Sequence, residues 1–125
     1  MLNRVGIKKE TAVSGNQILA SVGLQYSIGI IVQADAGTQD ESTGRKLCKA
    51  GTPLKVDPTN LQTPATKSTA EEGNVVLLHD VDVTDGNANG TGLVIGIVNF
   101  NRLDKSVQSL LPAGSSVAGV FCIAL

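Results

Sequence analysis

Hydrophobic residues along the chain either alternate with polar ones, at the two-residue period of β-strands, or form short runs rich in Val and Ile. Both patterns favour strands, because β-branched side chains fit a pleated, half-buried surface. Six segments have such a pattern: 26–34, 46–48, 53–56, 74–83, 92–100 and 117–125. Residues 16–24 fit a short strand and a helical turn equally well. The pattern therefore predicts a mainly β structure.

One segment has a helical pattern instead. Apolar side chains recur three and four positions apart in residues 101–111, at Leu103, Val107, Leu110 and Leu111. This is the spacing of one helix face. Asn101 or Asp104 can cap the start by accepting backbone N–H bonds, and Pro112 ends the helix. The expected fold class is mainly β with one short helix, a small α+β domain.

Polar segments divide the chain. Residues 1–15 carry few apolar side chains, too few to offset an ordering cost of roughly 1–2 kcal/mol per residue of backbone, so we expect a flexible N-terminal arm. Residues 57–73 contain two prolines and four threonines without any periodicity, which predicts a surface loop. Residues 16–125 then form a single β-rich domain, since 125 residues suffice for one hydrophobic core.

Charge and aromatic content narrow the function. Charged residues make up 17% of the chain, below the roughly 25% typical of soluble domains, so we expect part of the surface to be covered by self-association. The net charge of −1 gives no global attraction to nucleic acid or to an anionic membrane. The three aromatic residues offer no platform for stacked bases or sugars. No run approaches the roughly 20 apolar residues of a membrane span. Neither nucleic acid nor a membrane is therefore an expected partner.

The two cysteines, Cys48 and Cys122, lie in apolar strand patterns. They do not form a CxxC pair, and the single histidine, His79, cannot complete a zinc site with them. The first 13 residues lack an apolar stretch long enough for a signal peptide. We therefore expect two reduced thiols in a protein made in a cytoplasm.

The acidic segment between the two strongest predicted strands is a candidate metal site. Residues 80–91 read DVDVTDGNANGT. An EF-hand loop that begins at Asp80 needs glycine at its sixth position and glutamate at its twelfth. This chain has Asp85 and Thr91 there. The EF-hand match therefore fails, and an irregular calcium site stays an alternative.

A turn explains the same segment better. Asp85-Gly86 and Asn89-Gly90 are residue pairs that tolerate positive φ. Long apolar segments flank them on both sides. The preferred interpretation is a hairpin over 75–100 with an exposed acidic tip.

Catalysis by His79 is not expected. Neighbouring side chains in a strand point to opposite faces, so His79 and Asp80 cannot form a base-and-orienter pair while 74–83 is one strand. The chain has no GxSxG elbow and no GxxxxGK[ST] phosphate loop. We expect no catalytic, cofactor-binding or metal residues, and no enzyme.

Three sequence segments and their order point to a family. They read KAGTPLKVD at 49–57, VVLLHDVDVT at 75–84 and GLVIGIVNFNRL at 92–103, and a short helix ending in LP and a terminal strand follow. This order resembles the small head decoration proteins of tailed bacteriophages, the lambda type, over roughly residues 26–125. It is also similar to the shell-binding part of phage head fibre proteins.

The resemblance implies a function. It implies a compact β-rich subunit that forms homotrimers, binds the major capsid protein on the outer surface of an expanded capsid, and stabilises the head, so that the protein is located in the virion. Family members bind the shell with an N-terminal arm. In this chain residues 4–8 alternate in a way that suits an added strand. The expected capsid-binding residues are Arg4, Val5, Ile7, Lys8 and Lys9. Two alternatives stay open: a phage head fibre or tail-associated β module, and a calcium- or small-ligand-binding β domain.

Overall fold

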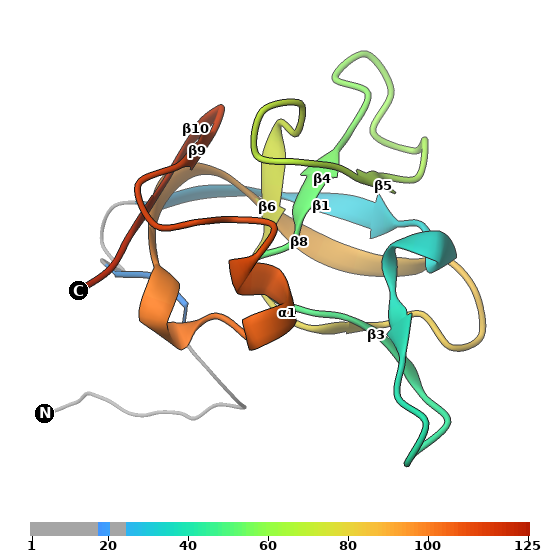
Figure 1. Cartoon of the computed structure of the whole chain (residues 1–125). Helices are drawn as coiled ribbons and strands as arrows, with labels where there is room; N and C mark the ends of the chain where they lie inside the picture. Colours follow the sequence, from blue (N-terminus) through green and yellow to red (C-terminus); the bar gives the residue numbers. More distant parts are fainter. Residues whose placement is uncertain (1–17, 21–24) are drawn as a thin grey trace, which may run out of the picture.

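The computed structural model describes residues 18–20 and 25–125 (Figure 1). Its strands are β1 (Gln25–Val32), β2 (Thr38–Gln39), β3 (Lys46–Cys48), β4 (Pro53–Lys55), β5 (Thr66–Lys67), β6 (Val75–Leu77), β7 (Val81–Asp82), β8 (Ala88–Asn99), β9 (Ser116–Val117) and β10 (Gly119–Ile123). The helical elements are η2 (Ala34–Ala36), η3 (Phe100–Arg102) and α1 (Lys105–Gln108). The fold class expected from the sequence, mainly β with one short helix, is confirmed.

Strand β8 is the centre of the larger sheet. It pairs with β1 antiparallel from Ala88 to Gly96 and with β6 antiparallel at Gly92 and Leu93, and it pairs with β10 in parallel from Ile95 to Asn99. The remaining strands extend the sheet in the order β5-β4-β6-β8-β10-β9, and β2, β3 and β7 form a second, three-stranded sheet. Residues 18–20 also pair with β8, since Leu19 bridges antiparallel to Val98. The ambiguous segment 16–24 is thus extended at Leu19.

The larger sheet curls until its ends meet. Val32 at the end of β1 forms a parallel bridge with Ala65, beside β5. Ala65 donates its N–H to the Ile31 carbonyl over 2.6 Å, and its own carbonyl accepts from the Gln33 N–H over 3.0 Å. Strands β1, β8, β6, β4 and β5 therefore form a closed ring.

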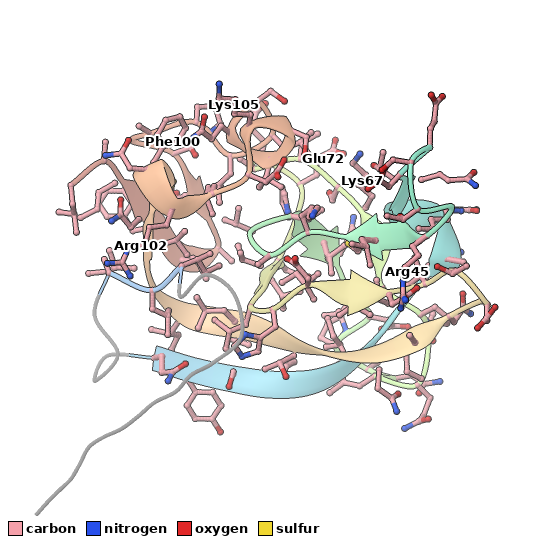
Figure 2. The ribbon with its side chains drawn as sticks, turned by 90° about the horizontal axis from the view of Figure 1, so that it is seen from below. Arg45, Lys67, Glu72, Phe100, Arg102 and Lys105 are labelled. Atoms are coloured by element: carbon pink, nitrogen blue, oxygen red, sulfur yellow. The ribbon has the colours of Figure 1, made fainter. Side chains whose placement is uncertain are left out.

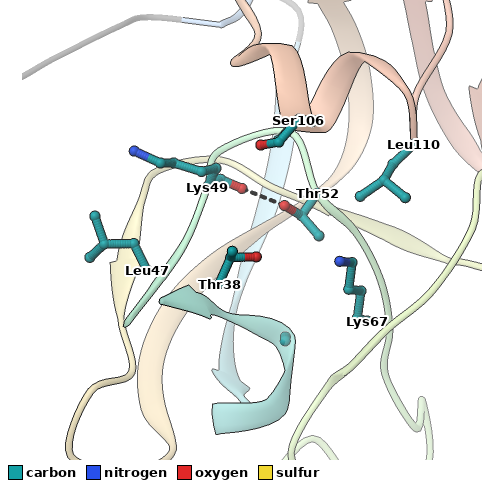
Figure 3. A pocket seen from close by; sticks show the side chains of 9 residues that line it. Thr38, Leu47, Lys49, Thr52, Lys67, Ser106 and Leu110 are labelled. Atoms are coloured by element: carbon teal, nitrogen blue, oxygen red, sulfur yellow. Dashed lines mark hydrogen bonds between the residues drawn. The ribbon is translucent and has the colours of Figure 1, made fainter. Parts of the chain in front are cut away.

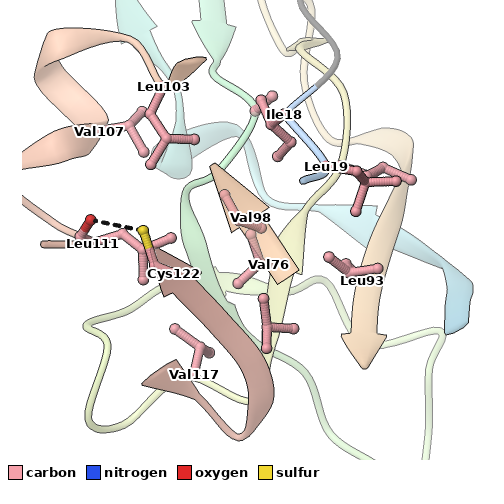
Figure 4. Close-up of a cluster of buried hydrophobic side chains, with 13 residues drawn as sticks. Ile18, Leu19, Val76, Leu93, Val98, Leu103, Val107, Leu111, Val117 and Cys122 are labelled. Carbon is pink, nitrogen blue, oxygen red and sulfur yellow. Dashed lines mark hydrogen bonds between the residues drawn. The ribbon is translucent and has the colours of Figure 1, made fainter. Parts of the chain in front are cut away.

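Two apolar clusters lie on opposite faces of the curled sheet. Val75 and Leu77 of β6 point into the cluster that fills the ring, together with Val32 and Leu54. Val76 points the other way, into a cluster that the C-terminal third of the chain covers (Figure 4). The members of this second cluster include Ile18, Leu93, Val98, Leu103, Val107, Leu111, Val117 and Cys122. Because β6 is buried on both faces, its sequence is continuously apolar rather than alternating.

The predicted strand 74–83 is wrong, because the structure divides it. Strands β6 and β7 belong to different sheets. Between them the backbone turns at His79, and the Asp80 carboxylate accepts a hydrogen bond from the Ala50 N–H over 2.7 Å. His79 and Asp80 are both exposed at this break. The argument that they lie on opposite faces of one strand therefore does not apply.

The predicted hairpin also differs from the structure. Gly86 has a φ of 133°, so the turn at Asp85-Gly86 is confirmed. Asn89-Gly90 is not a turn, because both residues lie inside β8. A Cβ on Gly90 would lie 2.9 Å from a Val81 methyl group, so this glycine permits close packing across the ring.

The helical region is shorter than 101–111. Asp104 caps α1 by accepting from the Ser106 N–H over 3.0 Å, as one of the two cap predictions had it. The other candidate, Asn101, is not a cap; it lies within η3, whose cap is Asn99. The predicted strand 117–125 is a hairpin of β9 and β10, since Ala118 adopts a φ of 52° between them. The loop 57–73 contains the short strand β5.

Candidate interaction surface

Four aspartates hold turns in this structure, and Asp82 of the acidic segment is one of them. Four Asp-x-Ser/Thr sequences share one geometry, in which the carboxylate accepts both the N–H and the hydroxyl of the residue two positions on: Asp40–Ser42, Asp57–Thr59, Asp82–Thr84 and Asp104–Ser106. The hydroxyl-to-carboxylate distances are 2.5–2.8 Å. Side chains of this length mimic a backbone turn. No prediction from the sequence covered this motif, although its spacing is visible in the chain.

These hydrogen bonds keep the carboxylates ionised. Hydrogen bonds from Thr84, and then from the Arg45 guanidinium, lower the pKa of Asp82 to about 2. Bonds from Ser42, Thr59 and Ser106 likewise lower the pKa of the aspartates that accept them. A donor to the charged form favours that form. The acidic turns are therefore stably charged and already hydrogen-bonded within the chain.

The structure does not gather these side chains into a metal site. Among residues 18–20 and 25–125, no three His, Cys, Asp or Glu side chains lie close enough together to hold a metal ion. Asp80 forms an ion pair with Lys49 over 3.9 Å, and Asp82 pairs with Arg45. Two of the three acids of the segment, Asp80 and Asp82, thus have a basic partner elsewhere in the chain. In the same part of the chain, no helix is long and apolar enough to span a membrane.

A small pocket lies between η2, β3 and α1 (Figure 3). Its volume is about 30 Å³, and its lining includes Thr52, Lys67 and Leu110. The Thr52 hydroxyl donates to the Lys49 carbonyl over 2.7 Å inside it. Small-molecule sites usually have volumes of about 300–1,000 Å³, so this pocket has room for water rather than for a substrate.

Both cysteines are buried free thiols. Cys48 lies in the cluster inside the ring and Cys122 in the cluster on the other face, so they lie on opposite sides of the sheet. Burial raises the pKa of both thiols. Neither sulfur is therefore readily ionised to the reactive thiolate.

An uncharged face at one end of β8 is the strongest candidate site. Five apolar residues form it, and we call it the uncharged face: Tyr26, Ile95, Ile97, Phe121 and Ile123. Tyr26 of β1 is the direct neighbour of Ile95 on β8, and Phe121 of β10 is the direct neighbour of Ile97. Direct neighbours and residues two positions apart share a face of a sheet. Tyr26, Ile95 and Phe121 are 64%, 50% and 51% exposed.

A bulge in β8 creates this face. The pairing register with β1 shifts between Tyr26 and Ser27, so Val94 and Ile95 together face one residue of β1. Val94 packs against the cluster inside the ring, whereas Ile95 lies past the end of the ring and is open. Gly119 of β10 allows β8 to lie close here, because a Cβ at Gly119 would be only 2.7 Å from the Val94 carbonyl oxygen.

Charge is absent from the strands that carry this face. Residues 25–34, 86–101 and 106–125 contain no Asp, Glu, Lys or Arg. All charged residues of the described chain therefore lie in 35–85 and 102–105. Figure 2 shows Lys67, Glu72 and Lys105 on the side of the molecule away from β1, which runs along the lower edge of that view.

The expected capsid-binding residues Arg4, Val5, Ile7, Lys8 and Lys9, and the predicted arm 1–15, lie outside the described residues. That prediction stays a prediction. Comparison of the chain with models of protein families, with curated proteins and with solved structures gives no match.

Proposed function

We propose that this chain is a structural virion protein that binds the outer surface of a bacteriophage capsid as a homotrimer and stabilises the expanded head. The uncharged face is the observation that carries the proposal, because soluble monomers rarely leave a contiguous apolar patch open to water. The resemblance to lambda-type decoration proteins supplies the kind of partner, the major capsid protein. The protein acts by contact, without catalysis or a cofactor.

Packing among the three sequence segments that carry the resemblance supports the proposal. Gly51 of KAGTPL has a φ of 95°, and a Cβ there would lie 2.6 Å from the Leu103 side chain of GIVNFNRL. The N–H of Gly51 also donates to the Leu77 carbonyl over 2.7 Å, which joins VVLLHDVDVT to the same place. The three segments thus meet in one packing unit.

Expanded heads that lack this protein provide the direct test. Purified protein should co-sediment with them to saturation, and the decorated heads should withstand a higher temperature before they release their DNA or break. Absence of saturable binding at micromolar concentration would contradict the proposal. Binding to tails instead would favour a tail-associated module, and heat released on titration with calcium would favour an ion-binding domain.

We further propose that residues 1–14 are the main shell anchor, through Arg4, Val5, Ile7, Lys8 and Lys9. A chain that begins at Gly15 keeps Ile18 and Leu19, which are 1% and 4% exposed in the core, so it should fold. Several arms per oligomer multiply the binding energy, and their loss should weaken binding to heads far more than it changes solution mass. Undiminished binding would place the anchor elsewhere, with the 57–73 loop the next candidate.

A further inference from the structure

We propose that the uncharged face is the surface through which copies of this chain associate, and that its occupant is the same face of a second copy. This inference rests on the proposed function for the purpose of the oligomer, but its test needs no capsid. It assigns the contact to a defined set of residues: Tyr26, Ile95, Ile97, Phe121 and Ile123.

The composition of the face is that of an interface core. The centres of protein interfaces are depleted in charged residues and enriched in aromatic ones. Two of the chain's three aromatic residues, Tyr26 and Phe121, lie on this face and are more than half exposed. On the same face of β8, an added Cβ would meet Leu77 at Gly90 and Val75 at Gly92, inside the ring, whereas Ile95 is 50% exposed. A second apolar surface packed on Tyr26, Ile95 and Phe121 would bury the part of this face that lies beyond the ring.

Charge complementarity favours a second copy over a charged partner. A charged surface docked here would lose hydration without meeting a countercharge, so the fitting partner surface is itself uncharged. This chain presents such a surface on β1, β8 and β10. The net charge of −1 also leaves little repulsion between copies. Around a three-fold axis, equivalent residues converge, so one patch near the axis can contact both neighbours.

The largely unpaired edge of β1 is an independent reason to expect a second copy at this place. One edge of β1 pairs with β8, and within the described residues the other edge pairs only at its end, through Ile31, Val32 and Gln33 with Ala65. Residues 25–30 along that edge contain no charged residue and no proline. Natural proteins protect open edges with such residues or cover them. A neighbouring copy on the uncharged face would cover this edge too.

Two lysine substitutions in the full chain test the inference. Ile95→Lys and Phe121→Lys each place a charge on the face, and because both positions are half exposed the new side chain can reach water in the monomer. Light scattering should show the wild-type chain at about three times 12.8 kDa and each variant at about 12.8 kDa. Circular dichroism should show both variants folded. Leu61→Lys is the matched control: Leu61 is 37% exposed in the β4–β5 loop, and its substitution should leave the mass unchanged.

The fluorescence of the wild-type chain provides a second test, which does not depend on whether a variant folds. The chain has one Tyr and no Trp, so its tyrosine fluorescence comes from Tyr26, on the proposed interface. Acrylamide should quench this fluorescence weakly in the oligomer and several-fold more strongly after dilution to monomer.

Three results would overturn the inference: quenching that does not change with concentration, a monomeric wild type, or variants that keep the wild-type mass. Variants that keep the mass but no longer bind heads would make the face a shell contact instead, whereas an oligomer that never binds heads would refute only the proposed function.

Discussion

The charged and uncharged regions of this molecule satisfy their backbone hydrogen bonds in different ways. In residues 35–85 the strands are two or three residues long. Such short strands leave backbone N–H groups unpaired next to them, and aspartate side chains accept hydrogen bonds from these groups. In the uncharged region β1 has 8 residues and β8 has 12, so the strands pair over long stretches. The exposed apolar side chains of Tyr26, Ile95 and Phe121 there hold no turn and can contact another molecule.

The difference assigns the formation of polar turns to the charged region and leaves the uncharged region available for the proposed association. The charged region needs its polar side chains to hold its own turns, and it therefore presents a hydrated surface. The uncharged region is held by its ladder and by the buried cluster beneath it. An interface can occupy its outer face without disturbing the turns, so mutations in the two regions should separate stability from association.

The largest effect is expected where the two regions meet, at Gly51. Gly51→Ala adds a methyl group 2.6 Å from Leu103 and forces a non-glycine residue to a φ of 95°. We expect a loss of about 2–4 kcal/mol in the free energy of unfolding, measured by urea denaturation. Gly29→Ala is the control, since nothing lies within 4 Å of its Cβ. Equal stabilities of the two variants would contradict the packing described here.

A smaller loss is expected at Gly119, on the uncharged side. Gly119→Ala would place Cβ 2.7 Å from the Val94 carbonyl oxygen, and this backbone atom cannot move without shifting β8. We expect a cost of about 1–3 kcal/mol in unfolding free energy. Because β10 would also move relative to Ile95, the proposed oligomer should dissociate at a higher protein concentration in this variant than in the wild type. A variant with wild-type stability would show that β8 and β10 are further apart than described.

The cap of α1 should contribute about 1 kcal/mol. Asp104→Ala removes the acceptor for the Ser106 N–H and hydroxyl, and the unfolding free energy should fall by that amount while the solution mass stays unchanged. Asp104→Asn retains an acceptor oxygen and should recover most of the loss. A change in solution mass would show that the charged region also affects association.

The smallest effect is the pH dependence of the charged region. The folded pKa of Asp82 is about 2, below its ordinary value of 3.8. A lowered folded pKa means that the carboxylate stabilises the fold above about pH 3.8 and that this contribution is lost as the pH falls toward 2. Thermal midpoints of wild type and Asp82→Asn, measured between these pH values, should converge on acidification. Parallel curves would show that Asp82 contributes no such stability.

The sequence was sufficient for the fold class, for a helix cap at either Asn101 or Asp104 and for the turn at Gly86, because each depends on local pattern and backbone preference. It was not sufficient for the break at His79, since the deciding hydrogen bond comes from Ala50, 30 positions away. In the sequence, the residues of the uncharged face lie in separate uncharged segments. Strand register is what brings Tyr26, Ile95 and Phe121 onto one surface, and register is a long-range property.

Electron microscopy of the parent particle tests the central proposal most directly. The proposed function predicts density for this chain on the outside of the expanded head, as trimers whose centres hold the uncharged faces of the three copies and whose undersides contact the major capsid protein. A head reconstruction in which the outer shell carries no density for this chain would contradict the account.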